Sequence, residues 1–241
     1  MAKSLVKLFS NLIYPPRCVF CSSRLSPKAK REVCTKCSNT LPYTRLYHRC
    51  KKCGKPASSK SEFCNRCRLT RQYNTKMTSP FIYADAAKKA VLAFKKERNS
   101  GAAKTLSVYM AEMVKYDFKN IEFDMVVSVP PRKKGQFEER YDQAAYLAKA
   151  VARNLSLPYV SGAMYQTERI RKQSTLSYHA RESNVSGKFA VKNPDRFLNK
   201  TVLLVDDVCT SGSTLNECAR MLKQCGAYRV YAVTLATVPA V

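Results

Sequence analysis

Acidic residues are scarce in this chain: its 241 residues include 17 Asp and Glu against 43 Lys and Arg, a formal net charge of +26. So one-sided a balance predicts a polyanionic partner, such as nucleic acid, an anionic membrane surface or phosphorylated small molecules. Composition alone does not choose among these partners. The length suits one ordinary domain and a small second one, and a hydrophobic fraction of 45% is enough for a packed core.

Long apolar runs are absent as well. No stretch approaches the roughly 18 apolar residues of a membrane-spanning helix, so no span is expected. The first residues, MAKSLVKLFSNLIYPPRC, lack a sustained apolar core and a small-residue cleavage site, which argues against a secretory signal. Their apolar residues recur at helical spacing and stop at Pro15 and Pro16, which predicts a short amphipathic helix. We expect this helix to pack on the protein's own body; an in-plane membrane helix is the alternative.

Cysteine is concentrated at one end, where eight of the eleven cysteines lie before residue 70 as four C-x2-C pairs. Each pair can bring two thiolates to one metal ion, and two pairs complete a tetrahedral zinc shell. Without a secretory signal, zinc explains the pairs better than a disulfide framework does. We expect two structural zinc ions with sequential pairing, although the spacing also permits a cross-braced arrangement. The expected ligands are Cys18, Cys21, Cys34 and Cys37 for one ion and Cys50, Cys53, Cys64 and Cys67 for the other.

The cysteine-rich segment is strongly basic. Residues 1–75 carry 17 Lys and Arg and 2 acids, and their formal charge is still +11 after eight thiolates and two divalent zinc ions are counted. Basic and aromatic side chains alternate near the third pair: Tyr43, Arg45, Tyr47, Arg49, Lys51 and Lys52. This composition is typical of surfaces that bind single-stranded DNA by charge and base stacking. The alternative is that the tyrosines fill a small core and the basic side chains face water.

The rest of the chain alternates between apolar runs and amphipathic stretches, after a polar linker, LTRQYNTKMTSP, that ends at Pro80. Strands are predicted at FIYA, DMVVSVP, TVLLV and RVYAVTLATV, and helices over 85–97, 101–118, 139–155 and 213–224. This alternation predicts a doubly wound α/β fold with parallel strands and crossover helices. We expect an N-terminal helix and zinc-binding domain over 1–75 and the α/β domain over 76–241.

The stretch VLLVDDVCTSGSTL, residues 202–215, joins a buried strand to an acid pair and a loop of small residues. A helix that begins after such a loop offers N–H groups to an anion, and Gly212 lets the backbone approach closely. The acids Asp206 and Asp207 would repel a phosphate but can accept hydrogen bonds from sugar hydroxyls, with Mg2+ nearby to balance charge. We therefore expect a clamp for a phosphorylated ribose, with the phosphate held by Thr210, Ser211, Gly212, Ser213 and Thr214.

Two other nucleotide-binding patterns are absent. The chain has neither G-x-G-x-x-G after a strand nor G-x4-G-K-[ST], which argues against a dinucleotide site and a P-loop ATPase. The acid pair of a response regulator would lie early in its domain, whereas this pair lies late.

The acid pair and its loop resemble the phosphoribosyl diphosphate (PRPP) signature of type I phosphoribosyltransferases. Together with the cysteine pairs, the stretches YPPRCVFC, VVSVPPRKKGQFEERYDQAAYLA and ERIRKQSTLSYHARESNVSGKF are similar to the ComF/ComFC competence proteins over nearly the whole chain. One departure is clear. Where that family usually reads R-G-F-N-Q, this chain has Arg140, Tyr141, Asp142 and Gln143, without the glycine.

The resemblance implies a type I phosphoribosyltransferase-like fold, a mostly parallel, doubly wound sheet behind a double zinc ribbon. It implies that Asp206 and Asp207 hold ribose hydroxyls, that residues 210–214 bind the 5-phosphate, and that Mg2+ accompanies PRPP. The turn with Arg132 and Lys133, followed by Lys134 and Arg140, would face the diphosphate. Residues 169–189 would form a mobile catalytic loop that carries Arg169, Gln173, Arg181 and Asn184. The implied catalytic set is Asp206, Asp207, Arg169 and Arg181.

The resemblance also implies a cytoplasmic role in natural transformation. The protein would handle single-stranded DNA at the inner face of the cytoplasmic membrane, beside a competence helicase and the inner-membrane DNA channel. Contact with the membrane would then be peripheral. The alternative is an active phosphoribosyltransferase of nucleotide metabolism or salvage with no direct role in DNA handling.

Overall fold

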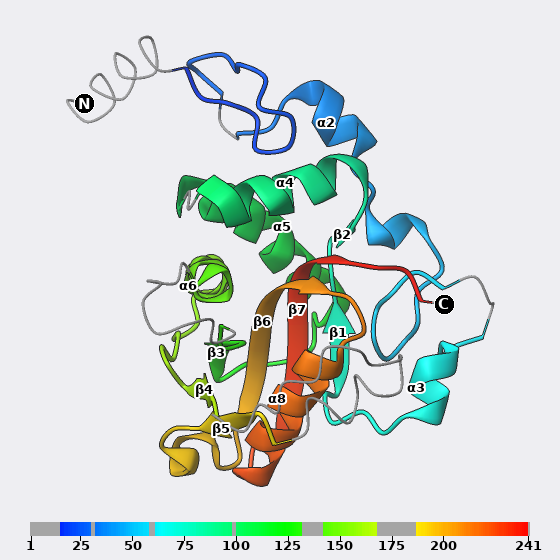
Figure 1. Cartoon of the computed structure of the whole chain (residues 1–241), viewed down its shortest axis with the longest axis vertical. Helices are drawn as coiled ribbons and strands as arrows, with labels where there is room; N and C mark the ends of the chain where they lie inside the picture. The colour runs from blue at the N-terminus through cyan, green and yellow to red at the C-terminus, as the bar shows by residue number, and fades with distance from the viewer. Residues whose placement is uncertain are drawn as a thin grey trace.

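The computed structural model describes residues 15–29, 32–57, 61–97, 100–131, 142–167 and 187–240. The amphipathic helix expected before Pro15 lies outside these ranges. Figure 1 shows the α/β domain with the cysteine-rich segment running across one end and down one side of it. None of the described helices is both long and apolar enough to cross a membrane.

The α/β domain is built on a five-stranded sheet in which every described pairing is parallel. Strands β7 and β6 lie inside the sheet, β3 flanks β6, and the short β1 and β2 both pair with β7. The strands are β1 (Lys76–Thr78), β2 (Phe81–Ile82), β3 (Met125–Ser128), β6 (Thr201–Cys209) and β7 (Arg229–Thr237). The mostly parallel, doubly wound α/β fold expected from the sequence is therefore confirmed.

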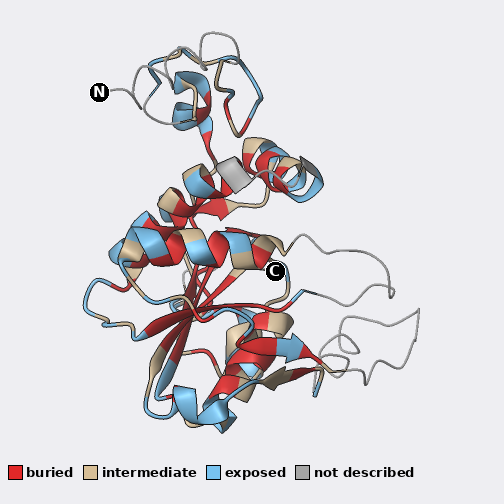
Figure 2. Cartoon of the chain, turned by 90° about the vertical axis from the view of Figure 1, so that its left-hand side faces the viewer, coloured by how far each residue is buried: buried red, intermediate tan, exposed pale blue. Residues whose placement is uncertain are grey.

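Helices cover both faces of the sheet. On one face, β6 and β7 share a core cluster with α4 (Asp85–Glu97), α5 (Ser100–Asp117) and α6 (Gln143–Leu155). On the other face, the cluster is completed by α8 (Ser213–Gln224). Helices α4 and α8 match the expected ranges, and α5 begins and ends one residue earlier than expected. Helix α6 begins at Gln143 rather than 139; residues 139–141 lie outside the described part. In Figure 2 the central strands are buried and the outer sides of the helices are exposed.

Burial on both faces explains the composition of β6. Residues 202–205 are fully buried because helices lie above and below the strand, as is usual for parallel sheets. The strand was expected to end at Val205, but its pairing with β7 continues from Asp206, opposite Thr234, to Cys209, opposite Thr237. The acid pair therefore lies within the strand's last residues, where burial decreases, and not beyond its end.

Two short pairings were not anticipated. Lys76–Thr78, assigned to the polar linker, forms β1 and pairs with β7, because the edge of β7 offers partners that no local pattern reveals. An antiparallel ribbon of β4 (Met164–Gln166) and β5 (Phe189–Val191) packs against the α8 side of the domain. The turn after β5 contains the 3-10 helix η2 (Pro194–Phe197).

The cysteine-rich segment packs on the domain in two places. Its first part, which includes α2 (Thr35–Thr40), contacts the α5 side of the core through Phe20, whose ring lies 5.6 Å from Phe81 and 6.0 Å from Tyr109. Its second part contains η1 (Thr44–Leu46) and α3 (Asn65–Leu69). The second part lies beside the loop that precedes α8, which it contacts through Lys55 and Arg66.

Candidate functional site

The small-residue loop lies at the carboxyl end of β6 and leads into α8. Gly212 caps α8 with a φ of 82°, in the left-handed region that favours glycine. The N–H of Ser213 donates to Ser211 Oγ at 3.3 Å, and the two serine hydroxyls lie 3.0 Å apart. Thr210 is exposed and residues 211–214 are half-buried, so the loop is accessible. Because the first N–H groups of a helix lack intrahelical partners, this end of α8 favours an anion.

The acid pair extends to both faces of the sheet, because successive strand residues point in opposite directions. Asp207 forms an ion pair with Lys95 of α4, in which Oδ2 lies 2.7 Å from the lysine Nζ. On the other face, Asp206 lies near Cys218 of α8. The pKa of the Cys218 thiol is raised above its ordinary value, mainly by burial and then by the negative charge of Asp206. Backbone groups orient both carboxylates: Asp206 Oδ1 accepts from the N–H of Asp207 at 2.8 Å, and Asp207 Oδ1 from the N–H of Val208 at 2.5 Å.

A third carboxylate lies near Asp207. Asp142 caps α6 by accepting a hydrogen bond from the N–H of Ala145 at 2.8 Å. Burial raises the pKa of Asp142, its hydrogen bonds to backbone N–H groups lower it, and the negative charge of Asp207 raises it further. The net pKa is above the ordinary value. Asp142 belongs to the position where the chain departs from R-G-F-N-Q, and the structure gives it a capping role.

Several expected site residues lie outside the described part of the chain. These are Arg132 and Lys133, expected at the diphosphate, and Arg169 and Arg181, expected on the catalytic loop. Sequence reasoning in turn missed Lys95, and also Lys55 and Arg66 of the cysteine-rich segment. No local pattern marks these three, because each reaches the site through contacts between distant parts of the chain.

The eight N-terminal cysteines form two clusters, each with its four sulfur atoms within 4.8 Å of one another. One holds Cys18, Cys21, Cys34 and Cys37, the other Cys50, Cys53, Cys64 and Cys67, which is the sequential pairing. All eleven cysteines of the chain are described, and all carry free thiols, so no disulfide framework is present.

The geometry of both clusters fits a tetrahedral metal ion. Four sulfur atoms about 2.3 Å from a zinc ion would lie about 3.8 Å apart. The Cys21 and Cys34 sulfurs lie 3.7 Å apart, as do those of Cys53 and Cys64. Backbone N–H groups also point at sulfur, since the N–H of Cys64 lies 3.4 Å from Cys50 Sγ. Four thiolates leave no open coordination position, so the role of such a metal would be structural.

The residues expected to bind DNA divide into two groups. Tyr43 packs against the hydrophobic core, and its ring centroid lies 5.4 Å from that of Phe81. Arg49 forms two hydrogen bonds of 2.7 and 2.8 Å with Asp117, whose side chain is 7% exposed. For these two residues the structural alternative holds. Tyr47, at 53% exposure, and Arg45 are exposed at the surface. Lys51 is also exposed but forms an ion pair with Glu62, and Lys52 is half-buried.

Comparison with known proteins identifies both parts of the chain. Residues 9–68 match the double zinc ribbon domain, and residues 142–240 match the phosphoribosyl transferase domain. Competence protein F of Haemophilus influenzae is 25% identical over 214 residues, which cover 87% of this chain and 92% of that protein. The DNA utilization protein YhgH of Escherichia coli K12 is 26% identical over 201 residues, covering 82% of this chain and 87% of that protein.

Among solved structures, an adenine phosphoribosyltransferase is 12% identical and covers 60% of this chain and 83% of its own, with a TM-score of 0.38. The assignment of the fold therefore rests on the parallel sheet and on the two domain matches. Since those matches agree with the two sulfur clusters and the loop at β6, the chain consists of a double zinc ribbon domain followed by a phosphoribosyltransferase domain, and it is similar over most of its length to Competence protein F and DNA utilization protein YhgH.

Proposed function

We propose that this protein binds PRPP at the carboxyl end of β6 and acts in the handling of single-stranded DNA during natural transformation. The observation that carries the first part is the acid pair Asp206 and Asp207 near the carboxyl end of β6, where the strand leads into the loop and the N-terminus of α8. The second part is supported by the similarity to Competence protein F and to the DNA utilization protein YhgH over most of the chain.

The two halves of this site suit the two halves of a phosphorylated ribose. The loop supplies N–H groups and hydroxyls, which bind the 5-phosphate, and the positive end of the helix dipole favours its charge. The carboxylates of Asp206 and Asp207 accept hydrogen bonds from the ribose hydroxyls. Mg2+ prefers oxygen ligands and is usually bound through one or two carboxylates together with substrate phosphates, so it would accompany the diphosphate here.

If PRPP is turned over, the reaction is the loss of diphosphate from C1 of the ribose, which leaves positive charge on the sugar. Groups that bind the departing diphosphate more tightly in the transition state than in the bound substrate would accelerate this step. We assign that task to Arg132, Lys133, Arg169 and Arg181, whose positions the described residues do not include. Asp206 and Asp207 would orient the ribose and stabilise its developing charge.

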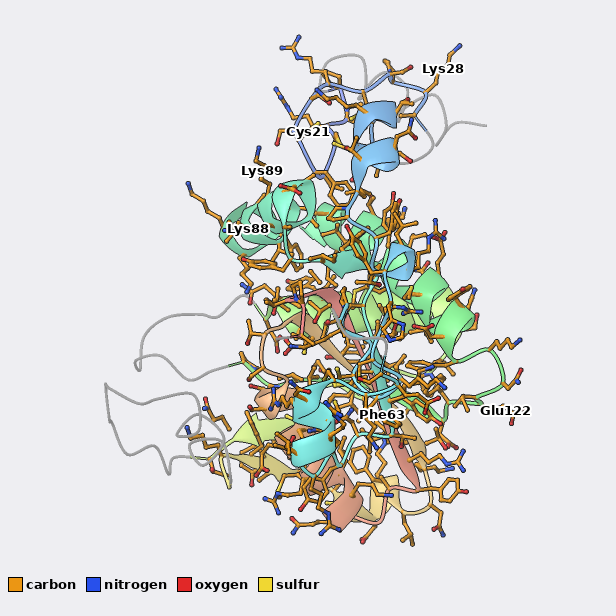
Figure 3. The ribbon with its side chains drawn as sticks, turned by 90° about the vertical axis from the view of Figure 1, so that its right-hand side faces the viewer. Cys21, Lys28, Phe63, Lys88, Lys89 and Glu122 are labelled. Atoms are coloured by element: carbon orange, nitrogen blue, oxygen red, sulfur yellow. The ribbon has the colours of Figure 1, made fainter. Side chains whose placement is uncertain are left out.

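The DNA-binding part of the proposal is supported by the charge of the zinc-ribbon segment. Arg45, Lys51, Arg68 and Arg71 are exposed there, and Tyr47 offers an exposed ring for stacking. Further exposed lysines lie along α4: Figure 3 shows Lys88 and Lys89 pointing outward near the end that carries Cys21. We place the protein in the cytoplasm at the inner face of the membrane, where a helicase and the DNA channel would be its partners.

A second candidate is an active phosphoribosyltransferase with no direct DNA role. It is favoured by the similarity to an amidophosphoribosyltransferase of Schizosaccharomyces pombe, which is 30% identical over 115 residues, or 48% of this chain and 19% of that protein. Incubation with PRPP and Mg2+, with and without single-stranded DNA, separates the two. Diphosphate release that needs an added base or amine and ignores DNA supports the transferase. Binding of PRPP and DNA without turnover supports the first proposal.

A further inference from the structure

The second zinc ribbon contains the cluster of Cys50, Cys53, Cys64 and Cys67. Two of its cationic side chains reach the small-residue loop, residues 210–214, which we call the phosphate loop. Lys55, which is 7% exposed, donates a hydrogen bond from Nζ to the carbonyl oxygen of Thr210. Arg66 of α3 donates from Nη2 to Ser213 Oγ at 3.0 Å. One contact therefore fixes the backbone at the start of the loop, and the other fixes a hydroxyl at the first residue of α8.

Backbone hydrogen bonds tie the surrounding segments together. The N–H of Met77, in β1, donates to the carbonyl of Lys52 at 2.9 Å, and the N–H of Ala240 donates to that of Pro56 at 2.8 Å. Beyond α3, the N–H of Tyr73 donates to Asn216 Oδ1 in α8 at 2.6 Å. The second ribbon is thus attached to β1, to the chain after β7 and to α8, the elements that surround the loop.

Lys55 and Arg66 lie beside a cavity between the second ribbon and the phosphate loop. A cavity of about 200 Å³ lies there, lined by Cys53, Cys64 and Cys67 on one side and by Thr210, Ser211 and Gly212 on the other. Lys55 and Arg66 also line this cavity. Beside this space, the hydrogen bonds from Lys55 and Arg66 join the ribbon directly to the loop.

Charge links these contacts to the metal. A zinc ion with four thiolates carries a formal charge of −2, so cationic side chains beside it are favoured. Lys55 follows the Cys50–Cys53 pair, and Arg66 lies between Cys64 and Cys67. Since zinc ribbons are folded by their metal, loss of zinc would remove both side chains from their positions.

The first ribbon has different contacts. It packs on the α5 side of the core through Phe20, and Glu32 accepts a hydrogen bond from Thr105 Oγ1 in α5 at 3.2 Å. Figures 1 and 3 both place α2 at the end of the molecule near α4, whereas α3 lies near α8.

We propose that Lys55 and Arg66 are positioning residues for the phosphate loop, so that the second zinc ribbon, and not the first, determines the loop's conformation. An effect of these two residues on PRPP affinity rests on the proposed function. Their effect on the order of the loop backbone does not, because it is measured in the protein without ligand.

Hydrogen exchange of the backbone N–H groups at residues 210–216 tests the proposal directly in the full chain. In Lys55→Met with Arg66→Met, loss of two hydrogen bonds should speed this exchange by roughly tenfold. Zinc content should stay that of wild type. The matched control, Lys51→Met with Arg68→Met, removes two exposed charges from the same ribbon and should leave the exchange unchanged. Lys55→Arg with native Arg66 keeps both donors and should also retain protection.

The metal arm uses one variant of each ribbon. Cys64→Ser with Cys67→Ser should speed exchange at the loop, and Cys34→Ser with Cys37→Ser should not. The proposal is wrong if the Lys55 and Arg66 variant keeps wild-type protection with both metals bound, or if the two ribbon variants loosen the loop equally. Calorimetry with PRPP and Mg2+ then tests the site: failure of the wild type to bind PRPP refutes the proposed function and leaves the exchange result standing.

Discussion

The ammonium group of Lys95 lies 2.7 Å from a carboxylate oxygen of Asp207, and so joins the last turns of α4 to the carboxyl end of β6. The Lys95 side chain is 40% exposed and that of Asp207 16% exposed, so the pair is accessible from solvent on the lysine side. One of the two acids is thus neutralised before any ligand binds. Since PRPP is itself polyanionic, this neutralisation lowers the repulsion that the acid pair would otherwise exert.

We predict that Lys95→Met weakens PRPP binding by about tenfold, because the variant leaves the Asp207 charge uncompensated beside an anionic ligand. Lys95→Arg should retain most of the affinity. The neighbouring Lys96 is exposed and has no described contact with the acid pair, so Lys96→Met serves as the control. Isothermal calorimetry measures all three. Equal affinities of the Lys95→Met and Lys96→Met variants would show that the ion pair has no role in the site.

We predict two zinc ions per chain, held by sequentially paired cysteines. Elemental analysis of purified protein should give close to two. Cys21→Ser with Cys34→Ser damages a single site under sequential pairing, so one zinc should remain, whereas in a cross-braced arrangement it would damage both. A zinc content near zero in this variant, or near one in the wild type, would contradict the prediction.

We predict that Asp142→Asn makes the protein more stable at neutral pH than the wild type. Asn caps a helix about as well as Asp, so the cap of α6 is kept. The pKa of Asp142 is raised by burial and by Asp207, above its ordinary value of 3.8. The folded state therefore binds the proton more tightly, and the wild type loses stability as pH rises from the ordinary pKa through the folded one.

Urea unfolding of both proteins from about pH 4 to 8 measures this difference. The advantage of the Asn variant should grow with pH and then level off. A constant difference, or one that shrinks as pH rises, would show that the charge of Asp142 is not destabilising.

How much of the fold and of the candidate site could be predicted from the sequence depends on how far apart the interacting residues lie in the chain. The β6–loop–α8 unit and the two sulfur clusters were predictable, because burial pattern, Gly212 and C-x2-C spacing are local signals. The Lys55–Thr210 contact spans 155 residues, and no pattern near either residue indicates it. For Tyr43 and Arg49 the sequence left DNA binding and a structural role both open for the same reason: their structural partners, Phe81 and Asp117, lie far along the chain.

The DNA prediction is accordingly restricted to exposed residues. Replacing Arg45, Lys51 and Arg68 with Gln should flatten the dependence of log affinity on log salt, by about 0.7 for each DNA phosphate that the variant no longer neutralises on a single strand. Tyr47→Leu should keep the slope and reduce affinity at high salt, because a stacked base contributes roughly 1–3 kcal/mol without releasing counterions. Fluorescence anisotropy with labelled oligonucleotides measures both effects.

The control replaces three exposed cations elsewhere, Lys149, Arg153 and Lys223, with Gln. Figure 1 shows α6, which carries the first two, on the opposite side of the domain from α3. If this control flattens the salt dependence as much as the ribbon variant does, DNA binds by general attraction and the ribbon surface is not its site.

The central claim is that the acid pair at the end of β6 binds the ribose of PRPP, and calorimetric titration of the zinc-loaded protein with PRPP and Mg2+ tests it most directly. The wild type should bind with one site per chain. In Asp206→Asn with Asp207→Asn, loss of charge-assisted hydrogen bonds of about 1.5–3 kcal/mol each should weaken binding by roughly two to four orders of magnitude. The exposed Asp195 provides the control, since Asp195→Asn should bind as the wild type does. No binding by folded wild-type protein, or unchanged affinity in the double variant, would contradict the claim.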